Sequence, residues 1–311
     1  MARHLVIGAG LIGRGLARQL IDRGDDVTLV SRSGTSVDGA TARAVEATDA
    51  DALTSVATGS TTVFLTANPK DYHRWPELWP PMFAAAIETT RRASARLVMM
   101  GNLYAYGERA GMPMAERDRL AATETKGAVR QAGWELALAA HHRGEIQAAE
   151  VRASDYFGPG AEATAQLGRG FFAPLLSGKT ARLFGSADQP HSWSYLPDIT
   201  STLVAAADHA GEWGRAWHVP SAEPLTRREI ADRVDALTGS GGTVSPWPRW
   251  LLRAMALGSP LIRAANDSLY QFDRPFVIDS TETERMLGVR ATPWAEALPP
   301  TIDWYREHPS R

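Results

Sequence analysis

Short apolar runs alternate with longer amphipathic stretches through the first half of the sequence. The apolar runs are typical of buried strands and lie at His4–Ile7, Asp26–Ser31, Thr62–Thr66, Arg96–Met100 and Ile146–Arg152. Between them, apolar residues three and four positions apart predict crossover helices at Leu11–Arg23, Met82–Ala93 and Thr123–His142. This alternation predicts an α/β fold, a Rossmann doubly wound parallel sheet.

The rhythm loosens after Gly158-Pro159-Gly160 into shorter mixed elements. Here the pattern predicts helices at Thr226–Leu237 and Trp247–Ala256 and a strand at Pro275–Asp279. We therefore expect residues 1–160 to form the sheet domain, with some later segments returning to it. Residues 161–311 are expected to form mainly a smaller C-terminal α/β lobe that binds substrate.

Composition narrows the class of protein. The chain has 311 residues, 44% hydrophobic and 22% charged, as in ordinary soluble proteins, and its formal charge of −2 gives no field that would gather nucleic acid or an anionic membrane. No signal peptide and no apolar run of about 20 residues is present, so we expect no membrane partner. With no cysteine, disulfides and thiolate chemistry are excluded, which suits a reducing compartment and predicts a cytoplasmic protein.

A glycine motif follows the first predicted strand directly. Gly8-Ala9-Gly10-Leu11-Ile12-Gly13 matches G-x-G-x-x-G and opens the first helix. Gly8 permits the tight turn, Gly10 lets the backbone approach a pyrophosphate, and Gly13 allows close packing of helix on strand. The N–H groups of Leu11 and Ile12 at the helix start are then available to phosphates, and Ala67, just past another strand, joins this predicted binding set.

The second strand ends without the acid that NAD-binding proteins commonly place on the ribose hydroxyls. Its last residues run Val30-Ser31-Arg32-Ser33. Arg32, flanked by Ser31 and Ser33, and Arg14 just past the glycines are suited to charge-assisted hydrogen bonds with a 2′-phosphate. The sequence therefore favours NADP(H) over NAD(H).

From the fingerprint onward the chain resembles the extended short-chain dehydrogenase/reductases, the NAD-dependent epimerase/dehydratase family, over essentially its whole length. Three further segments carry the resemblance. The segment Asn102-Leu103-Tyr104-Ala105-Tyr106-Gly107 is similar to the family's S-S-x-x-Y-G. Residues 151–160 are similar to its L-R-x-x-x-x-Y-G-P-G, and residues 195–199 are similar to its V-x-D-V. The resemblance implies a nicotinamide cofactor and, because members often dimerise through helices flanking the site, a homodimer.

The chain departs from the family at the reacting groups. The family uses a Ser or Thr and a Y-x-x-x-K pair, whose Tyr exchanges the proton and whose Lys holds the ribose. Here the Ser position falls at Asn102, and Y-x-x-x-K aligns with Lys126 and Arg130. An alternative alignment equates Lys126 with the family Lys and puts Ala122 at the Tyr position. Both alignments remove the tyrosine.

Other residues must then carry the chemistry. Lys126 is the leading candidate acid/base, because a neighbouring Arg130 and partial desolvation lower a lysine pKa, and the isoflavone-reductase-like members use a lysine without the tyrosine. Residues four apart share a helix face, so both cations are expected to face the cofactor groove. Tyr104 and Tyr156, each just beyond a strand, are the next candidates, and Asn102 is retained as a hydrogen-bonding group.

Aromatic residues give the substrate side a rather apolar character. The residues expected to line the pocket are Trp75, Trp79, Phe171, His191 and Trp193. Sugar-nucleotide members of the family carry an arginine near the position of His191 that contacts the diphosphate, and its loss argues against a UDP-sugar epimerase. Lys126 and Arg130 also suit an anionic substrate.

These observations predict an NADP(H)-dependent oxidoreductase acting on a small, fairly apolar carbonyl-type substrate. The missing Tyr and Ser leave a second class open, a catalytically silent NADP-binding regulator similar to NmrA-like proteins. A third is an epimerase or dehydratase with tightly bound NAD. No metal site is expected, because His141 and His142 point to different faces of a helix.

Overall fold

A computed structural model describes the chain except for residues 163–164, 249, 252–268 and 310–311. Its centre is a seven-stranded sheet in the order β10-β6-β5-β4-β1-β2-β3, and each neighbouring pair is parallel. The strands are β1 (Arg3–Ile7), β2 (Asp26–Ser31), β3 (Thr41–Ala44), β4 (Thr62–Leu65), β5 (Arg96–Asn102), β6 (Gln147–Ala153) and β10 (Arg215–His218). The strand order reverses between β1 and β4, which confirms the predicted doubly wound sheet.

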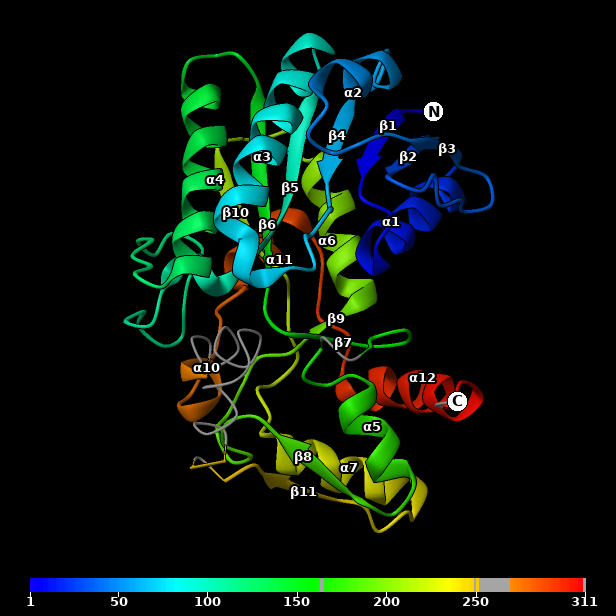
Figure 1. Cartoon of the computed structure of the whole chain (residues 1–311), viewed down its shortest axis with the longest axis vertical. Helices are drawn as coiled ribbons and strands as arrows, with labels where there is room; N and C mark the ends of the chain where they lie inside the picture. Colours follow the sequence, from blue (N-terminus) through cyan, green and yellow to red (C-terminus); the bar gives the residue numbers. More distant parts are fainter. Residues whose placement is uncertain (163–164, 249, 252–268, 310–311) are drawn as a thin grey trace.

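Helices cover both faces of the sheet (Figure 1). On one face lie α2 (Ala50–Val56), α3 (Trp75–Arg92) and α4 (Thr125–His142), joined to the strands by the short helices η1 (Tyr72–Arg74) and η2 (Leu103–Tyr106). On the other face lie α1 (Leu11–Asp22), α6 (Leu196–Asp208) and the short α11 (Thr281–Leu287). Each face has its own apolar core, so the sheet is buried on both sides, as parallel sheets are.

The predicted strands of the first half all form, with ends shifted by one or two residues. The helix predicted to begin at Met82 begins instead at Trp75, because Pro80 and Pro81 lie within a helix that continues through them. The sequence pattern missed β3 and β10. Their short segments, Thr41–Ala44 and Arg215–His218, carry no run of large apolar residues.

A second, smaller lobe lies beyond the carboxyl ends of the strands (Figure 1). It holds two short parallel pairs, β7 (Tyr156–Phe157) with β9 (Ser194–Tyr195) and β8 (Thr180–Leu183) with β11 (Thr243–Pro246). Its helices are α5 (Arg169–Leu176), α7 (Arg227–Thr238), α10 (Tyr270–Asp273) and α12 (Trp294–Glu307), packed around a third apolar core. From the same half of the sequence, α6 and β10 return to the large sheet.

One predicted strand of this lobe is wrong. Within Pro275–Asp279 only isolated bridges form, from Phe276 to His191 and from Ile278 to Met114, because the segment runs between two partners and stays with neither. The predicted helix Trp247–Ala256 lies largely outside the described residues; its helical part within them is Trp250–Leu251. Among the described residues, no helix combines the length and apolar character that a membrane span needs.

Candidate active site

The glycine loop between β1 and α1 has the geometry of a dinucleotide cradle. A Cβ added to Gly8 would lie 2.4 Å from the Ala67 nitrogen, and one added to Gly13 would lie 1.8 Å from the Gly8 carbonyl oxygen. At Gly10, in contrast, an added Cβ meets nothing within 4 Å. Two glycines therefore allow close backbone packing, and the third leaves open space at the start of a helix, as a pyrophosphate requires.

The first turn of α1 faces this open space. Gly10 is the N-cap with no side-chain hydrogen bond, and Leu11 and Ile12 follow, both partly exposed. Ala67 lies beside the loop directly after β4, where the Thr66 hydroxyl donates to the Gly8 carbonyl at 2.9 Å. Backbone N–H groups at a helix start, with an adjacent strand end, form a site for a negatively charged group.

Polar side chains surround the end of β2, where the sequence predicts the adenosine ribose. The Ser31 hydroxyl accepts from the Thr35 N–H at 2.9 Å, and the Ser33 and Thr35 hydroxyls are 2.9 Å apart. Arg32 is exposed, and no carboxylate of the described chain forms an ion pair with it. An exposed arginine between two hydroxyls, with the partly exposed Arg14 on α1, fits a phosphate in this position.

The carboxyl ends of β4 and β5 bring aromatic rings and a cation together. The Lys126 ammonium nitrogen is 5.7 Å from the ring centroids of both Tyr72 and Tyr104. Lys126 is 7% exposed and lies in the first turn of α4. Gly127 permits this approach, since a Cβ there would lie 2.3 Å from the Tyr104 carbonyl oxygen. The structure thus brings two predicted catalytic residues, Lys126 and Tyr104, into contact.

The hydroxyls of this cluster are held in the protonated form. Burial raises the pKa of Tyr104 well above its usual value, and the negative charge of Asp155 raises it further. Burial likewise raises the pKa of Tyr72. The Tyr270 hydroxyl donates to Glu124 at 3.0 Å, at the N-terminus of α4. The protonated Tyr104 phenol can therefore donate a hydrogen bond to a substrate oxygen or nitrogen, whereas the Tyr270 proton is held by Glu124.

Asn102 and Tyr156 lie at the ends of neighbouring strands, as predicted. The Asn102 side-chain oxygen accepts from the Tyr104 N–H at 3.1 Å and caps η2, so its local role is structural. Tyr156 begins β7 and is partly exposed, with its ring packed against the core on the α1 and α6 side of the sheet. A part in chemistry stays a prediction for both residues.

Arg130 lies four residues after Lys126 but is directed into the protein. Its guanidinium donates to the Met100 carbonyl oxygen, stacks 4.3 Å from the Trp79 ring centroid, and is 3.9 Å from the Glu150 carboxylate. Burial lowers its pKa to about 10. Arg130 is 3% exposed, so the expectation that it faces the cofactor groove is wrong. The Trp79 ring, the Met100 carbonyl and the Glu150 carboxylate hold its guanidinium inside the protein.

The aromatic residues predicted to line the pocket are mostly core residues. Trp75 and Trp79 belong to the core beneath α3, and Phe171 packs within the C-terminal lobe; each is 1% exposed. Trp193 is 2% exposed and donates its indole N–H to the Leu225 carbonyl at 3.0 Å. The structure gives these rings a packing role, which follows from the large area that each one buries. Contact with substrate stays a prediction.

His191, also 2% exposed, has a polar surrounding that the sequence did not indicate. Its Nε2 is 3.1 Å from the Asp155 carboxylate, and its Nδ1 is 3.2 Å from the Gln271 carbonyl oxygen. Asp155 follows the end of β6, next to the strand that ends before Tyr104. Sequence reasoning missed Asp155, although the rule that sites lie at strand carboxyl ends points to it.

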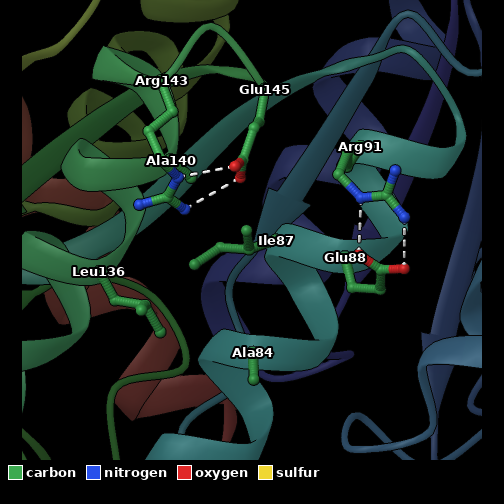
Figure 2. A pocket seen from close by; sticks show the side chains of 8 residues that line it. All are labelled: Ala84, Ile87, Glu88, Arg91, Leu136, Ala140, Arg143 and Glu145. Atoms are coloured by element: carbon green, nitrogen blue, oxygen red, sulfur yellow. Dashed lines mark hydrogen bonds and ion pairs between the residues drawn. The ribbon is translucent and has the colours of Figure 1, made fainter.

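A shallow groove between α3 and α4 lies at the other end of these helices (Figure 2). Its walls carry Ile87 and Leu136, and ion pairs Arg91–Glu88 and Arg143–Glu145 flank it. Because α3 and α4 begin at the carboxyl ends of β4 and β5, residues near their C-termini are remote from Lys126. The groove is therefore separate from the candidate active site.

Comparison with known proteins places this geometry in a family. The model of the NAD dependent epimerase/dehydratase family matches residues 4–219, from β1 through β10. Comparison of the sequence with curated proteins gives no significant match.

Solved structures of the same fold cover nearly the whole chain. A UDP-glucose 4-epimerase from Thermotoga maritima, solved with UDP-glucose, has a TM-score of 0.79 at 16% identity and covers 99% of this chain and 100% of its own. A dTDP-glucose 4,6-dehydratase from Streptomyces venezuelae with NAD has a TM-score of 0.77 at 20% identity, over 98% and 97%. A UDP-glucuronic acid 4-epimerase from Bacillus cereus with NAD has a TM-score of 0.80 at 15% identity, over 99% and 100%.

Proposed function

Because the chain belongs to the NAD-dependent epimerase/dehydratase family, we propose that it is an NADP(H)-dependent oxidoreductase acting on a small, fairly apolar carbonyl-type substrate. The proposed binding of a nicotinamide cofactor rests on the open space at Gly10, between a helix N-terminus and Ala67. When bound there, the nicotinamide supplies or takes up hydride. The side chains at the ends of β4, β5 and β6 then orient the substrate and stabilise its charge.

A substitution at Gly10 tests the cradle itself. In Gly10→Ala the new methyl fills the open space and meets no protein atom within 4 Å, so the fold is expected to be unchanged while NADPH binding weakens at least tenfold. Gly170→Ala is the matched control, because an added Cβ there also meets nothing within 4 Å. Unchanged NADPH affinity in Gly10→Ala would remove the cradle from the proposal.

The preference for NADP(H) rests on Arg32. Structural neighbours are complexes with NAD, so the 2′-phosphate is the feature that must distinguish this chain. Arg32→Ala is expected to weaken NADPH binding about tenfold or more, the value of one charge-assisted hydrogen bond, and to leave NADH binding unchanged. Arg290→Ala, another exposed arginine, is the control. Equal affinity of the unmodified protein for NADPH and NADH would refute the preference.

Lys126 is the proposed source of positive charge at the reacting heteroatom. Its ammonium lies against Tyr104 at the strand ends, where negative charge on a reduced carbonyl oxygen would need stabilisation. With Tyr104, it is also a candidate for the proton. Lys126→Ala is expected to abolish turnover and spare cofactor binding, with the exposed Lys179→Ala as control. Full activity of Lys126→Ala would exclude a lysine mechanism.

The position at which sugar-nucleotide members carry an arginine supports a substrate without a diphosphate. His191 lies near that position in the sequence, and its ring is engaged with Asp155 and Gln271 inside the protein. Asp155 places a carboxylate, not a cation, at this end of the site. The pair Asp155–His191 therefore does not replace that arginine as a diphosphate ligand, which supports a neutral carbonyl or imine substrate.

The second candidate is an epimerase or dehydratase with tightly held NAD, because structural neighbours with NAD have those activities. The third, a silent NADP-binding regulator, is motivated by the missing Tyr and Ser of the family. A fluorescence titration with NADPH and NADH, followed by a panel of carbonyl, imine and enone compounds, separates the three. Turnover establishes the oxidoreductase, NAD retained through purification favours the epimerase, and tight NADPH binding without turnover favours the regulator.

A further inference from the structure

His191 is an imidazole with an oxygen acceptor at each nitrogen. Nδ1 is 3.2 Å from the Gln271 carbonyl oxygen, which can only accept, so Nδ1 carries a proton. Nε2 is 3.1 Å from the Asp155 carboxylate oxygen. If Nε2 and that oxygen both carried only lone pairs, the contact would be repulsive. One further proton must therefore lie between His191 and Asp155.

The ring is fixed in this position by aromatic packing. His191 stacks on Phe272 at 5.0 Å between ring centroids and on Phe276 at 5.1 Å, and Trp193 lies 4.2 Å away. Its side chain is 2% exposed, whereas the Asp155 side chain is 19% exposed. The pair therefore has a buried histidine and a carboxylate through which its proton can leave.

The exposed end of the pair lies at the candidate active site. Ala153 at the end of β6 is in register with Asn102 at the end of β5, so Asp155 and Tyr104 each follow two residues later on neighbouring parallel strands. The negative charge of Asp155 also raises the pKa of the Tyr104 hydroxyl. The Ser154 hydroxyl also lies 3.4 Å from His191 Nε2.

We propose that Asp155 is the catalytic acid/base of this site and that His191 is its positioning residue, an inference that rests on the proposed oxidoreductase function. In reduction, the substrate carbon accepts hydride, and the electron pair of its double bond moves to the heteroatom. That atom takes the proton shared by Asp155 and His191, leaving ionised Asp155 and neutral His191, and solvent returns the proton. In oxidation, Asp155 removes the alcohol proton. Lys126 then supplies positive charge alone.

Within the described part of the chain, titratable groups on η1, η2 and α7 lie near this pair. Tyr104 on η2 and Tyr72 on η1 both have pKa values raised by burial and by the Asp155 charge, so their hydroxyls stay protonated and neutral. Arg227 on α7 lies 4.8 Å from the Phe272 ring, against which His191 also stacks. Burial lowers its pKa to about 10, so it remains a cation below that pH.

Kinetics across pH tests the acid/base role. Asp155→Asn keeps a hydrogen bond to His191 but holds no transferable proton, so kcat for reduction is expected to fall about 100-fold or more with NADPH affinity unchanged. His191→Gln removes the imidazole that holds this proton against Asp155, so kcat for reduction is expected to fall and its pH profile to change shape, with KM unchanged. Asp155→Asn activity within threefold of the unmodified protein would overturn the proposal.

The chain offers a matched control at the amino ends of the strands, away from the candidate active site. His4, at the start of β1, is 2% exposed, and its Nε2 lies 3.4 Å from Asp25. His4→Gln and Asp25→Asn disturb a similar buried pair away from the strand carboxyl ends, so their pH profiles for kcat are expected to match the unmodified protein. The same change of pH profile in His4→Gln would assign the effect to stability and overturn the acid/base role.

Ring ¹⁵N NMR of histidine-labelled protein reads the proton directly, without turnover. The His191 signal is identified by its loss in His191→Gln. It is expected to show Nδ1 protonated throughout and an Nε2 proton that is lost in Asp155→Asn at neutral pH. Identical titration of His191 in the unmodified protein and Asp155→Asn would overturn the shared proton. If His191 titrates identically in the two proteins but NADPH-dependent turnover is present, only the acid/base proposal is overturned and the proposed function stands. If the protein neither binds NADPH nor turns over substrate, the proposed function and the acid/base proposal are both overturned.

Discussion

Glu150 offers a stringent test of how the buried charges hold the fold. It lies on β6 and is 1% exposed. One carboxylate oxygen accepts from Arg152 Nε at 2.7 Å, and the other lies 3.9 Å from Arg130. Arg152 also donates to the Tyr106 hydroxyl at 2.7 Å. A single carboxylate thus balances two guanidinium groups that are 2% and 3% exposed.

Glu150→Gln keeps the shape of the side chain but removes this balance. Two cations then remain in a poorly solvated interior, and removal of one partner of a buried ion pair costs about 3–5 kcal/mol. The amide oxygen still accepts one hydrogen bond, so we expect about 3 kcal/mol, a large share of the roughly 5–15 kcal/mol that stabilises a folded protein. Urea unfolding measures this as a lower midpoint at constant slope.

Glu88 is the matched control. Its carboxylate also lies between two arginines, accepting from Arg91 at 2.7 Å and from Arg92 at 2.6 Å. Hydrogen bonds from these residues lower its pKa to about 2, but the carboxylate is partly exposed on the surface of α3, whereas Glu150 is buried. Glu88→Gln should leave the urea midpoint unchanged because water screens both cations. A loss below about 1 kcal/mol in Glu150→Gln would refute the assigned balance of charges.

Three further predictions concern the fold. Burial lowers the pKa of His218 from 6.5 to about 4, so the free energy of unfolding should fall by up to about 3 kcal/mol as the pH drops through this interval, and His218→Gln should flatten that part of the curve. Gly13→Ala should lower the melting temperature, since its Cβ would lie 1.8 Å from the Gly8 oxygen. Thr226→Ala removes the capping box with Glu229 and should cost about 1 kcal/mol; equal urea midpoints would contradict it.

Elements with a strong local pattern could be predicted from the sequence. β2, at Asp26–Ser31, has the predicted bounds because its apolar run is bordered by turns, and the Gly8 loop follows from a motif whose spacing has a mechanical reason. β3 could not be predicted: Thr41–Ala44 is a short edge segment with largely exposed side chains, and its pairing with β2 defines it. Such strands are specified by a neighbour and not by their own sequence.

Arg130 shows that helical spacing alone does not predict which groups a side chain contacts. Spacing of four residues puts Lys126 and Arg130 on one face of α4, yet the two side chains have different partners. Lys126 meets the rings of Tyr72 and Tyr104, whereas Arg130 meets Trp79 and the Met100 carbonyl. Those partners come from separate elements, so no local pattern carries the information.

The pairing of Asp155 with His191 has the same origin and a larger consequence. The two residues lie 36 positions apart, and each by itself has an ordinary explanation. Only the fold shows that a carboxylate following the end of β6 lies 3.1 Å from a buried imidazole, beside the site that holds Lys126. A lysine supplies charge readily, but reduction also needs a proton. The pair meets that need from the neighbouring strand, so loss of the tyrosine does not by itself argue for loss of catalysis.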